Sequence, residues 1–243
     1  MNLVLFEQHE TGTPIPREDR RVRHVLTVLR RGTGELFDAG IVNGPRGKAA
    51  IVAATDEGVT FSFSPTAEPP PLPAIRLIVG LPRPQTARDI LRDATTLGVA
   101  SIDFVRTEKT EPGYAQSTLW SSGEWRRQVL AGAEQAFDTR LPEVTHGRTL
   151  ADVITELGVP SSGAAETRLA LDNYESAEPL ASGQPAGRIV FAIGAERGWS
   201  AAERQSLRAA GFKFVHLGPR VLRTETAVIA ALAVVGRRDG GGT

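Results

Sequence analysis

The sequence predicts an α/β protein in which a small β-barrel domain precedes a larger domain built around a mostly parallel sheet. Two observations predict this organisation: a proline-rich run occupies residues 65–73, and strand-like and helix-like segments alternate after it. Such a run cannot continue a helix or an interior strand, and it behaves as a semi-rigid spacer. We therefore expect one domain over residues 1–68 and a second over residues 73–243.

Short apolar segments separated by glycines characterise the first part of the chain. The predicted strands are Leu3–Phe6, Glu35–Asp38, Ala49–Ala53 and Val59–Phe63. In the last of them, apolar residues alternate with Thr60 and Ser62, which is the two-residue period of a half-buried strand. A helix at Arg20–Leu29 would place apolar side chains on one face and arginines on the other. This pattern predicts a small β-barrel with one basic helix.

Strands and helices alternate in the second part of the chain. The predicted strands are Ile75–Leu81, Ile102–Val105, Arg168–Asp172, Arg188–Ile193 and Lys213–Leu217. The predicted helices are Thr86–Leu97, Glu124–Phe137, Ala201–Ala210 and Glu225–Val235. Ser200 and Glu203 have the spacing of a capping box at the start of the third helix. Strands connected by helices of this length predict a mostly parallel sheet covered on both faces.

Composition restricts the function classes. The chain has no cysteine, which excludes disulfides, thiolate metal sites and a cysteine nucleophile, and its four histidines lack metal-ligand spacing. No dinucleotide-binding, P-loop or serine-hydrolase motif occurs. The N-terminus has no signal-peptide pattern, and the longest apolar stretch, Ala227–Val235, is far shorter than the roughly 20 residues of a membrane helix. We expect a soluble, cytoplasmic protein with no metal and no membrane partner.

Basic residues cluster near the N-terminus although the formal net charge of the chain is zero. The cluster contains Arg17, Arg20, Arg21, Arg23, His24, Arg30 and Arg31. A local basic surface can hold phosphates even on a neutral protein. The alternative is a solvated helix face with scattered partners.

Two loops near the C-terminus carry the clearest signals of a ligand site. The strand Arg188–Ile193 runs into a loop with Gly194 and Gly198 at its ends, and such glycines allow close approach of the backbone to a ligand. A plain strand–turn–helix joint is the alternative. The next strand ends at a Gly-Pro turn, and the polar tetrad at residues 223–226 opens an almost wholly apolar helix, for which a helix cap with a surface ion pair is the alternative. In an open α/β sheet, ligands bind beyond the carboxyl ends of the strands, where both loops lie.

These two motifs strongly resemble a known family. Ile-Gly-x-Glu-x-Gly-x-Ser at residues 193–200 and Leu-Gly-x-Arg-x-Leu-Arg-Thr-Glu-Thr-Ala at residues 217–227 resemble the 16S ribosomal RNA uridine-N3 methyltransferases (RsmE type) of the SPOUT superfamily. Three further segments resemble that family in the same order: His24–Gly32, Leu97–Lys109 and Ala133–Pro142. The resemblance covers nearly the whole chain.

The resemblance implies a PUA-like RNA-binding domain over residues 1–68 and a SPOUT methyltransferase domain with a deep trefoil knot over residues 73–243. It implies S-adenosylmethionine as the cofactor, a homodimer as the working state, and ribosomal RNA or the small ribosomal subunit as the partner. The expected cofactor-binding residues are Leu171, Ile193, Gly194, Glu196, Gly198, Leu217, Gly218, Leu222, Arg223, Thr224 and Thr226. The expected RNA-binding residues are Arg17, Arg20, Arg21, Arg23, His24, Arg30 and Lys109.

The chemistry of such an enzyme assigns two catalytic candidates. Uridine N3 carries a proton, so Glu225 is the candidate base or proton relay, and Arg223 would stabilise the developing negative oxygen or a phosphate. The alternative for Glu225 is a charge favoured by the helix dipole. Several positions depart from the family pattern: Ala195, Arg197, Thr86, Thr96 and Asp138. They leave open a methyltransferase acting on another RNA or a small molecule, or a non-catalytic RNA-binding paralogue.

Overall fold

The computed structural model describes residues 3–158, 166–180 and 187–236. The chain forms two compact units. The first consists of Met1–Pro71 and Leu130–Leu141, and the second consists of Leu72–Val129 and Pro142–Thr243. The proline-rich linker could not indicate that Leu130–Leu141 packs with the first unit, because this association depends on contacts between distant parts of the chain.

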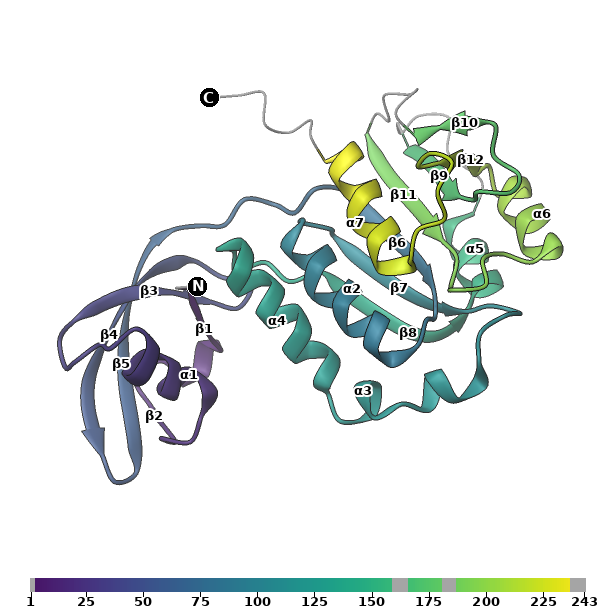
Figure 1. Cartoon of the computed structure of the whole chain (residues 1–243). Coiled ribbons are helices and arrows are strands. Elements are labelled where there is room, and N and C mark those ends of the chain that lie inside the picture. Colours follow the sequence, from purple (N-terminus) through teal and green to yellow (C-terminus); the bar gives the residue numbers. More distant parts are fainter. Residues whose placement is uncertain (1–2, 159–165, 181–186, 237–243) are drawn as a thin grey trace. The chain divides into compact units, whose positions relative to one another are not determined.

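The first unit contains a five-stranded sheet that curls into a half-barrel (Figure 1). Its strands are β1 (Val4–Phe6), β2 (Pro14–Ile15), β3 (Leu36–Ile41), β4 (Arg46–Thr55) and β5 (Gly58–Ala67), in the spatial order β1-β3-β4-β5-β2. The pair β1–β3 is parallel and the other pairs are antiparallel. All four predicted strands are present, although β4 and β5 are longer than expected and the short β2 was missed.

The basic segment does not form the single continuous helix that was predicted over Arg20–Leu29. A four-residue helix α1 (Arg20–Arg23) is followed by a π-helical turn at His24–Val28, and the chain leaves it through Arg30 at φ +52°. The predicted apolar face is confirmed, because Val22 and Val25 are fully buried against the sheet. The arginines therefore project from a short, irregular segment.

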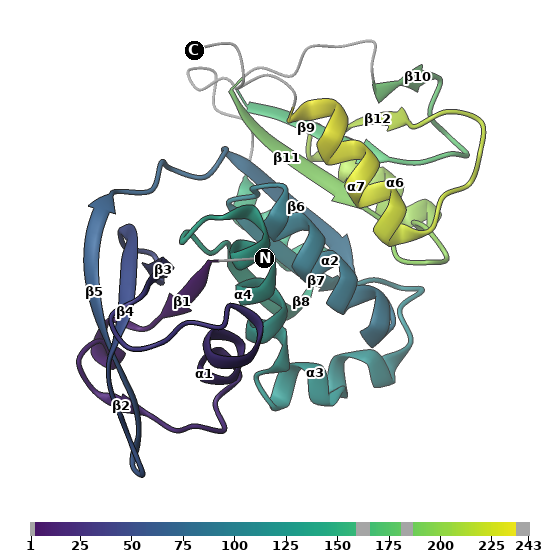
Figure 2. The ribbon, with the colours of Figure 1, turned by 60° about the vertical axis from the view of Figure 1, so that its left-hand side comes forward.

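The second unit is built on a seven-stranded sheet in which every neighbouring pair is parallel (Figures 1 and 2). Its strands, in spatial order, are β10 (Glu178–Pro179), β12 (Lys213–His216), β9 (Glu166–Leu171), β11 (Arg188–Ile193), β6 (Ile75–Gly80), β7 (Ser101–Arg106) and β8 (Glu143–Thr149). The five predicted strands are confirmed to within two residues at each end. The two missed strands, β8 and β10, are the edges of the sheet.

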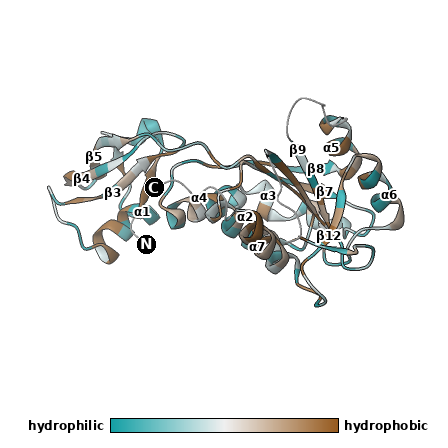
Figure 3. Cartoon of the chain, turned by 90° about the horizontal axis from the view of Figure 1, so that it is seen from above, coloured by the Kyte–Doolittle hydropathy of each residue, from teal (hydrophilic) through white to brown (hydrophobic). Residues whose placement is uncertain are grey.

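Helices cover both faces of this sheet, as expected. On one face α2 (Pro84–Thr96) packs against α7 (Thr224–Val235), and on the other face α5 (Leu150–Leu157) lies beside α6 (Ala201–Ala209) (Figures 2 and 3). The unit also contains α3 (Thr118–Ser121) and the start of α4 (Glu124–Ala136). The predicted capping box is confirmed, because Ser200 and Glu203 cap α6 reciprocally.

The apolar character of the central strands follows from this double cover. Residues 189–193 of β11 are all buried, and a strand buried on both faces has no solvated side to alternate with. Helix α7 is apolar throughout from Ala227 to Val235. Within the described ranges, no helix combines the length and apolarity that crossing a membrane requires. The trefoil knot and the PUA-like assignment remain predictions.

Candidate active site

A cavity of about 570 Å³ lies in the second unit, at the carboxyl ends of β9, β11 and β12. Its walls are the loops that follow these strands and the first turns of α2 and α7. They include most residues predicted for a ligand or catalytic site: Leu171, Ile193, Gly194, Glu196, Gly198, Leu217, Leu222, Arg223, Thr224 and Glu225. A volume of this size is typical of small-molecule sites. The structure thus brings the two predicted loops together around one space.

Two predicted cofactor residues do not line this cavity. Gly218 lies in the turn after β12 at φ +105°, where its N–H donates to Nδ1 of His216 at 3.0 Å. Thr226 is exposed in the first turn of α7. A turn-forming role fits Gly218 because few other residues adopt this backbone conformation.

A larger cavity of about 690 Å³ lies elsewhere in the second unit, beside the N-terminal ends of α5 and α6. Arg106 and Gln116 are among its lining residues, whereas neither the 193–198 loop nor the 217–224 loop contributes to it. We place the chemistry in the smaller cavity, because only that cavity has glycine backbone and the polar residues of α7 in its walls.

The first loop is folded tightly on itself. A Cβ atom on Gly194 would lie 2.9 Å from Cα of Gly198, which is closer than real side chains approach. Gly198 adopts φ +61°, and its N–H donates to the carbonyl of Ala195 at 2.8 Å. A Cβ atom on Gly80, at the end of β6, would lie 2.6 Å from the Ala195 nitrogen. Three glycines therefore permit a backbone arrangement that side chains would exclude.

Polar side chains from other elements hold this loop in place. Nζ of Lys109 donates to the carbonyls of Arg197 at 3.1 Å and Trp199 at 2.8 Å. The Glu196 carboxylate accepts a hydrogen bond from the backbone N–H of Arg83 at 3.0 Å, at the start of α2. The fully buried Trp199 donates from Nε1 to the carbonyl of Leu171 at 3.2 Å, which ties the loop to β9. These contacts fix the shape of the cavity wall.

The second loop leads from β12 into helix α7. Arg223 is the N-cap residue of α7, and its carbonyl accepts from the N–H of Ala227 at 2.8 Å. Thr224 is buried, Glu225 is half-buried, and the side chain of Arg223 is exposed. Within the described ranges neither Arg223 nor Glu225 forms an ion pair, in contrast to the surface pair that the alternative interpretation of this motif requires.

The loop after β9 also lines the cavity, and sequence reasoning missed all of it beyond Leu171. Asp172, Asn173 and Tyr174 lie in the wall, as does Arg83 from the start of α2. Nδ2 of Asn173 donates to the carbonyl of Arg220 at 3.2 Å, which joins this loop to the 217–224 loop. The available signal was the position of a polar triplet directly after a buried strand.

Comparisons with known proteins identify the family. The model of the RNA methyltransferase domain family matches residues 68–236. The ribosomal RNA small subunit methyltransferase E of Treponema pallidum is 37% identical over 240 residues, which span 97% of this chain and 90% of the relative. This chain belongs to the ribosomal RNA small subunit methyltransferase E family. The ribosomal RNA small subunit methyltransferase E 1 of Borreliella burgdorferi is 27% identical, over 95% of this chain and 95% of the relative.

Solved structures show the same fold. The methyltransferase E of Neisseria gonorrhoeae, crystallised with S-adenosylmethionine, superposes with a TM-score of 0.73 at 24% identity, covering 96% of this chain and 95% of that chain. The shared fold includes both units, because the superposition spans nearly the whole of each protein.

The two residues of the first loop that depart from the family pattern, Ala195 and Arg197, do not fill the cavity. The guanidinium of Arg197 pairs with Glu111 at 3.0 Å, and both side chains are largely exposed. Ala195 is buried beside Gly80. Trp199 lies beneath the loop and is not part of the cavity wall.

The other departures have local structural partners. Oγ1 of Thr86 accepts from Nε of Arg83 at 3.2 Å beside the cavity, and Oγ1 of Thr96 donates to the carbonyl of Arg92 within α2 at 3.0 Å. The Asp138 carboxylate accepts from the N–H groups of Thr139 and Arg140, which stabilises the turn after α4. Each of these residues thus has a hydrogen-bond partner within five residues of it in the chain.

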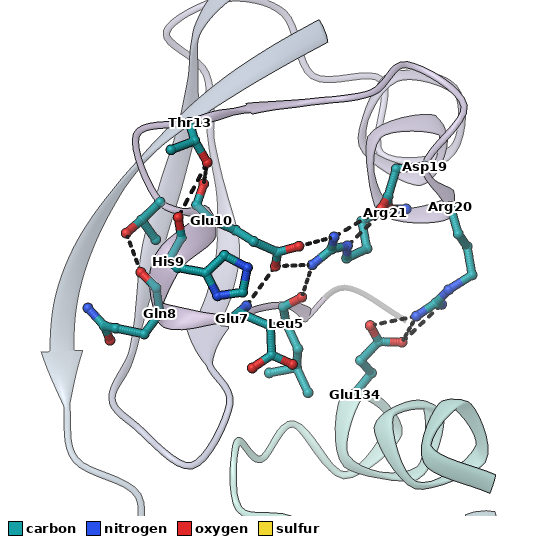
Figure 4. Close-up of polar contacts among 11 residues, drawn as sticks. Leu5, Glu7, Gln8, His9, Glu10, Thr13, Asp19, Arg20, Arg21 and Glu134 are labelled. Atoms are coloured by element: carbon teal, nitrogen blue, oxygen red, sulfur yellow. Dashed lines mark hydrogen bonds and ion pairs between the residues drawn. The ribbon is translucent and has the colours of Figure 1, made fainter. Parts of the chain in front are cut away.

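Two of the predicted RNA-binding arginines are engaged in ion pairs within the first unit (Figure 4). Arg21 lies between Glu10 and Asp19, at 2.7 Å and 2.9 Å respectively, and it also donates to the carbonyl of Leu5. Hydrogen bonds from Arg21 hold the pKa of Glu10 below its usual value, and the same contacts raise the pKa of Arg21. Arg20 forms a bidentate pair with Glu134 at 3.0 and 3.1 Å.

The remaining basic candidates differ in their availability. Nε of Arg17 donates to the carbonyl of Thr55 at 3.1 Å, whereas Lys109 is bound to the first loop of the second unit. Arg23 and Arg30 are exposed, and neither has an ion-pair partner among the residues that the structure describes. His24 is half-buried. The same described ranges contain no group of three or more metal-ligating side chains placed to hold a metal ion.

Proposed function

We propose that this chain is an S-adenosylmethionine-dependent methyltransferase that methylates N3 of a uridine in 16S ribosomal RNA. The observation that carries the proposal is the convergence of the 193–198 and 217–224 loops on one cavity at the carboxyl ends of parallel strands. The names of its relatives and the cofactor bound to the Neisseria gonorrhoeae protein support the same activity.

The residues present fit this cofactor. Leu171 and Ile193 provide buried apolar surface for a purine ring, and Gly194 and Gly198 allow the loop backbone to approach the ligand closely because they have no side chains. The carboxylate of Glu225 contributes negative charge to the cavity wall. When bound, S-adenosylmethionine supplies a methyl group on a positively charged sulfur. The 217–224 loop, including Leu217, Leu222 and Thr224, would hold the other side of the ligand.

Glu225 and Arg223 supply the groups that a uridine N3 acceptor needs. Bond formation between N3 and the methyl carbon, as the carbon–sulfur bond breaks, requires loss of the N3 proton. Glu225, in the first turn of α7, accepts the N3 proton. Arg223 stabilises the negative charge that develops on a carbonyl oxygen of the uracil ring. The step requires only these groups and the methyl donor, and no metal is needed for it.

The proposal includes the larger assembly implied by the family. The methyltransferase domain carries a trefoil knot, the first unit is a PUA-like RNA-binding domain, and the cytoplasmic enzyme acts as a homodimer. Exposed apolar Ile229 and Val234 on helix α7 support a dimer contact. Exposed Arg23 and Arg30 support phosphate binding by the first unit. The partner is the small ribosomal subunit or its RNA.

Methyl transfer from labelled S-adenosylmethionine tests this function. We expect the purified protein to label 16S ribosomal RNA, either free or in the small subunit, and mass mapping should place the methyl group on N3 of a uridine. Label on transfer RNA, or on another atom of the uridine, would contradict the proposed substrate and identify the true one. Cofactor binding without transfer to any RNA would indicate a small-molecule substrate, and neither binding nor transfer would indicate a non-catalytic paralogue.

The Glu225→Gln variant tests the proposed base. We expect turnover to fall about 100-fold or more, because positioned proton transfer contributes roughly 10²–10⁴-fold to rates. Calorimetry should still show binding of S-adenosylmethionine, since the amide keeps the size of the side chain. Wild-type turnover would remove Glu225 from this role and leave its charge as a helix-dipole contact.

A further inference from the structure

Tyr174 is an exposed aromatic side chain at the rim of the cavity. Its exposed fraction is 79%, and it lines the same space as the two glycine-containing loops. Val221, from the loop before α7, also lines this cavity and is 77% exposed. Leu171 and Ile193 are buried deeper in the wall. The mouth of the cavity therefore has an apolar surface that the folded chain does not use for its own packing.

The backbone that carries Tyr174 is held by a polar clamp. The Asp172 carboxylate, only 2% exposed, accepts hydrogen bonds from the N–H groups of Tyr174 at 2.7 Å and Glu175 at 2.8 Å. Nε of Arg204, from α6, donates to the other oxygen of the same carboxylate at 2.7 Å. Glu175 is also paired with Arg208 of α6. An exposed side chain on such a fixed loop is preorganised for a contact outside the folded chain.

One face of the Tyr174 ring is already occupied. The Arg204 guanidinium carbon lies 5.9 Å from the ring centroid, within the range of a cation–π contact. The high exposure of the ring leaves its opposite face to solvent. A ring supported from behind by a cation and open in front is a suitable surface for a flat, π-rich ligand.

We propose that Tyr174 receives the target nucleobase by stacking, an inference that rests on the proposed RNA methyltransferase function. An enzyme that acts on a base must take it out of its stack, and extruded bases are held against aromatic side chains. The rim position favours the RNA base over the adenine of the cofactor, because a macromolecular substrate reaches the cavity from its solvent side. Tyr174 is thus a substrate-positioning residue, with Val221 as a second apolar contact on the adjoining loop.

The variants Tyr174→Ala and Tyr174→Phe test this role against 16S ribosomal RNA. Stacking on an aromatic side chain predicts a roughly 5- to 150-fold loss of kcat/KM for the alanine variant. The phenylalanine variant should retain wild-type activity, because the ring rather than the hydroxyl makes the contact. Affinity for S-adenosylmethionine and the unfolding temperature should be unchanged in both variants.

Three results would overturn the inference: wild-type kcat/KM in the alanine variant, a parallel loss of cofactor affinity, or equal impairment in the phenylalanine variant. Wild-type protein that methylates no RNA would refute the proposed function itself, so the two failures are distinguishable.

A photochemical experiment on the unmodified protein gives an independent readout. 16S ribosomal RNA transcribed with 5-iodouridine, irradiated in complex with the protein and S-adenosylhomocysteine, should cross-link to the peptide that contains Tyr174. Cross-links confined to other peptides would contradict stacking at this residue. Because the wild-type chain is used, the result does not depend on the folding of a variant.

Discussion

Replacing Lys109 by methionine should weaken cofactor binding through the shape of the glycine loop. Lys109 lies on the loop after β7 and donates to two carbonyls, those of Arg197 and Trp199. A hydrogen bond involving a charged group contributes about 1.5–3 kcal/mol when it is at least partly buried. The contact to Trp199 is partly buried and the contact to Arg197 is exposed, so we expect the total to lie near the lower end. If the loop must regain its shape to bind, affinity for S-adenosylmethionine should fall about tenfold.

Calorimetric titration of the Lys109→Met variant with S-adenosylmethionine measures this effect directly. Methionine has nearly the same length as lysine but no charge, so the change removes the hydrogen bonds without opening a large gap. Lys48→Met is the matched control, because Lys48 forms an exposed pair with Asp38 in the first unit. Unchanged cofactor affinity, together with a specific loss of RNA affinity, would refute the loop-anchoring role and restore Lys109 as an RNA contact.

Two further predictions concern the first loop and the ion-pair network of the first unit. Gly194→Ala should reduce cofactor affinity roughly 5- to 150-fold, because the added Cβ would meet the Gly198 backbone and overpacking costs about 1–3 kcal/mol. Calorimetry measures this affinity. Wild-type affinity would show that the loop tolerates a side chain. Arg21 lowers the pKa values of Glu10 and Asp19, although burial opposes the shift. This stabilisation is present above the unfolded-state values of about 4 and is lost as the pH falls through the lower folded-state values. Urea unfolding of Arg21→Met and wild-type protein between pH 6 and 3 should show a stability difference that shrinks towards acid, and a constant difference would contradict the linkage.

The sequence was sufficient for elements whose signal is local. The apolar run of β11 and the capping box at Ser200 and Glu203 depend on neighbours in the chain, and both were predicted correctly. The edge strands were missed because they have no such local signal. β8 (Glu143–Thr149) contains no fully buried residue, so its pattern lacks the apolar signature of an interior strand.

The roles of individual charged residues could not be predicted, because each depends on a partner distant in sequence. The sequence predicts an RNA contact for Lys109, whereas in the structure this residue donates hydrogen bonds to the first loop of the cavity. Arg21 has a neighbouring carboxylate in Asp19, yet its second partner, Glu10, is brought near by the fold. In the sequence Tyr174 is a tyrosine that follows an aspartate and an asparagine, and only its position in the cavity wall gives it a function to test.

A crystal structure of the chain grown with saturating S-adenosylmethionine tests the cofactor site most directly. We expect the ligand between the Gly194–Gly198 loop and the Leu217–Thr224 loop, with the methyl group facing Glu225 and the Tyr174 rim. Density for the ligand in the cavity beside α5 and α6, or none in either cavity, would contradict the assignment of the 570 Å³ cavity as the methyl-donor site.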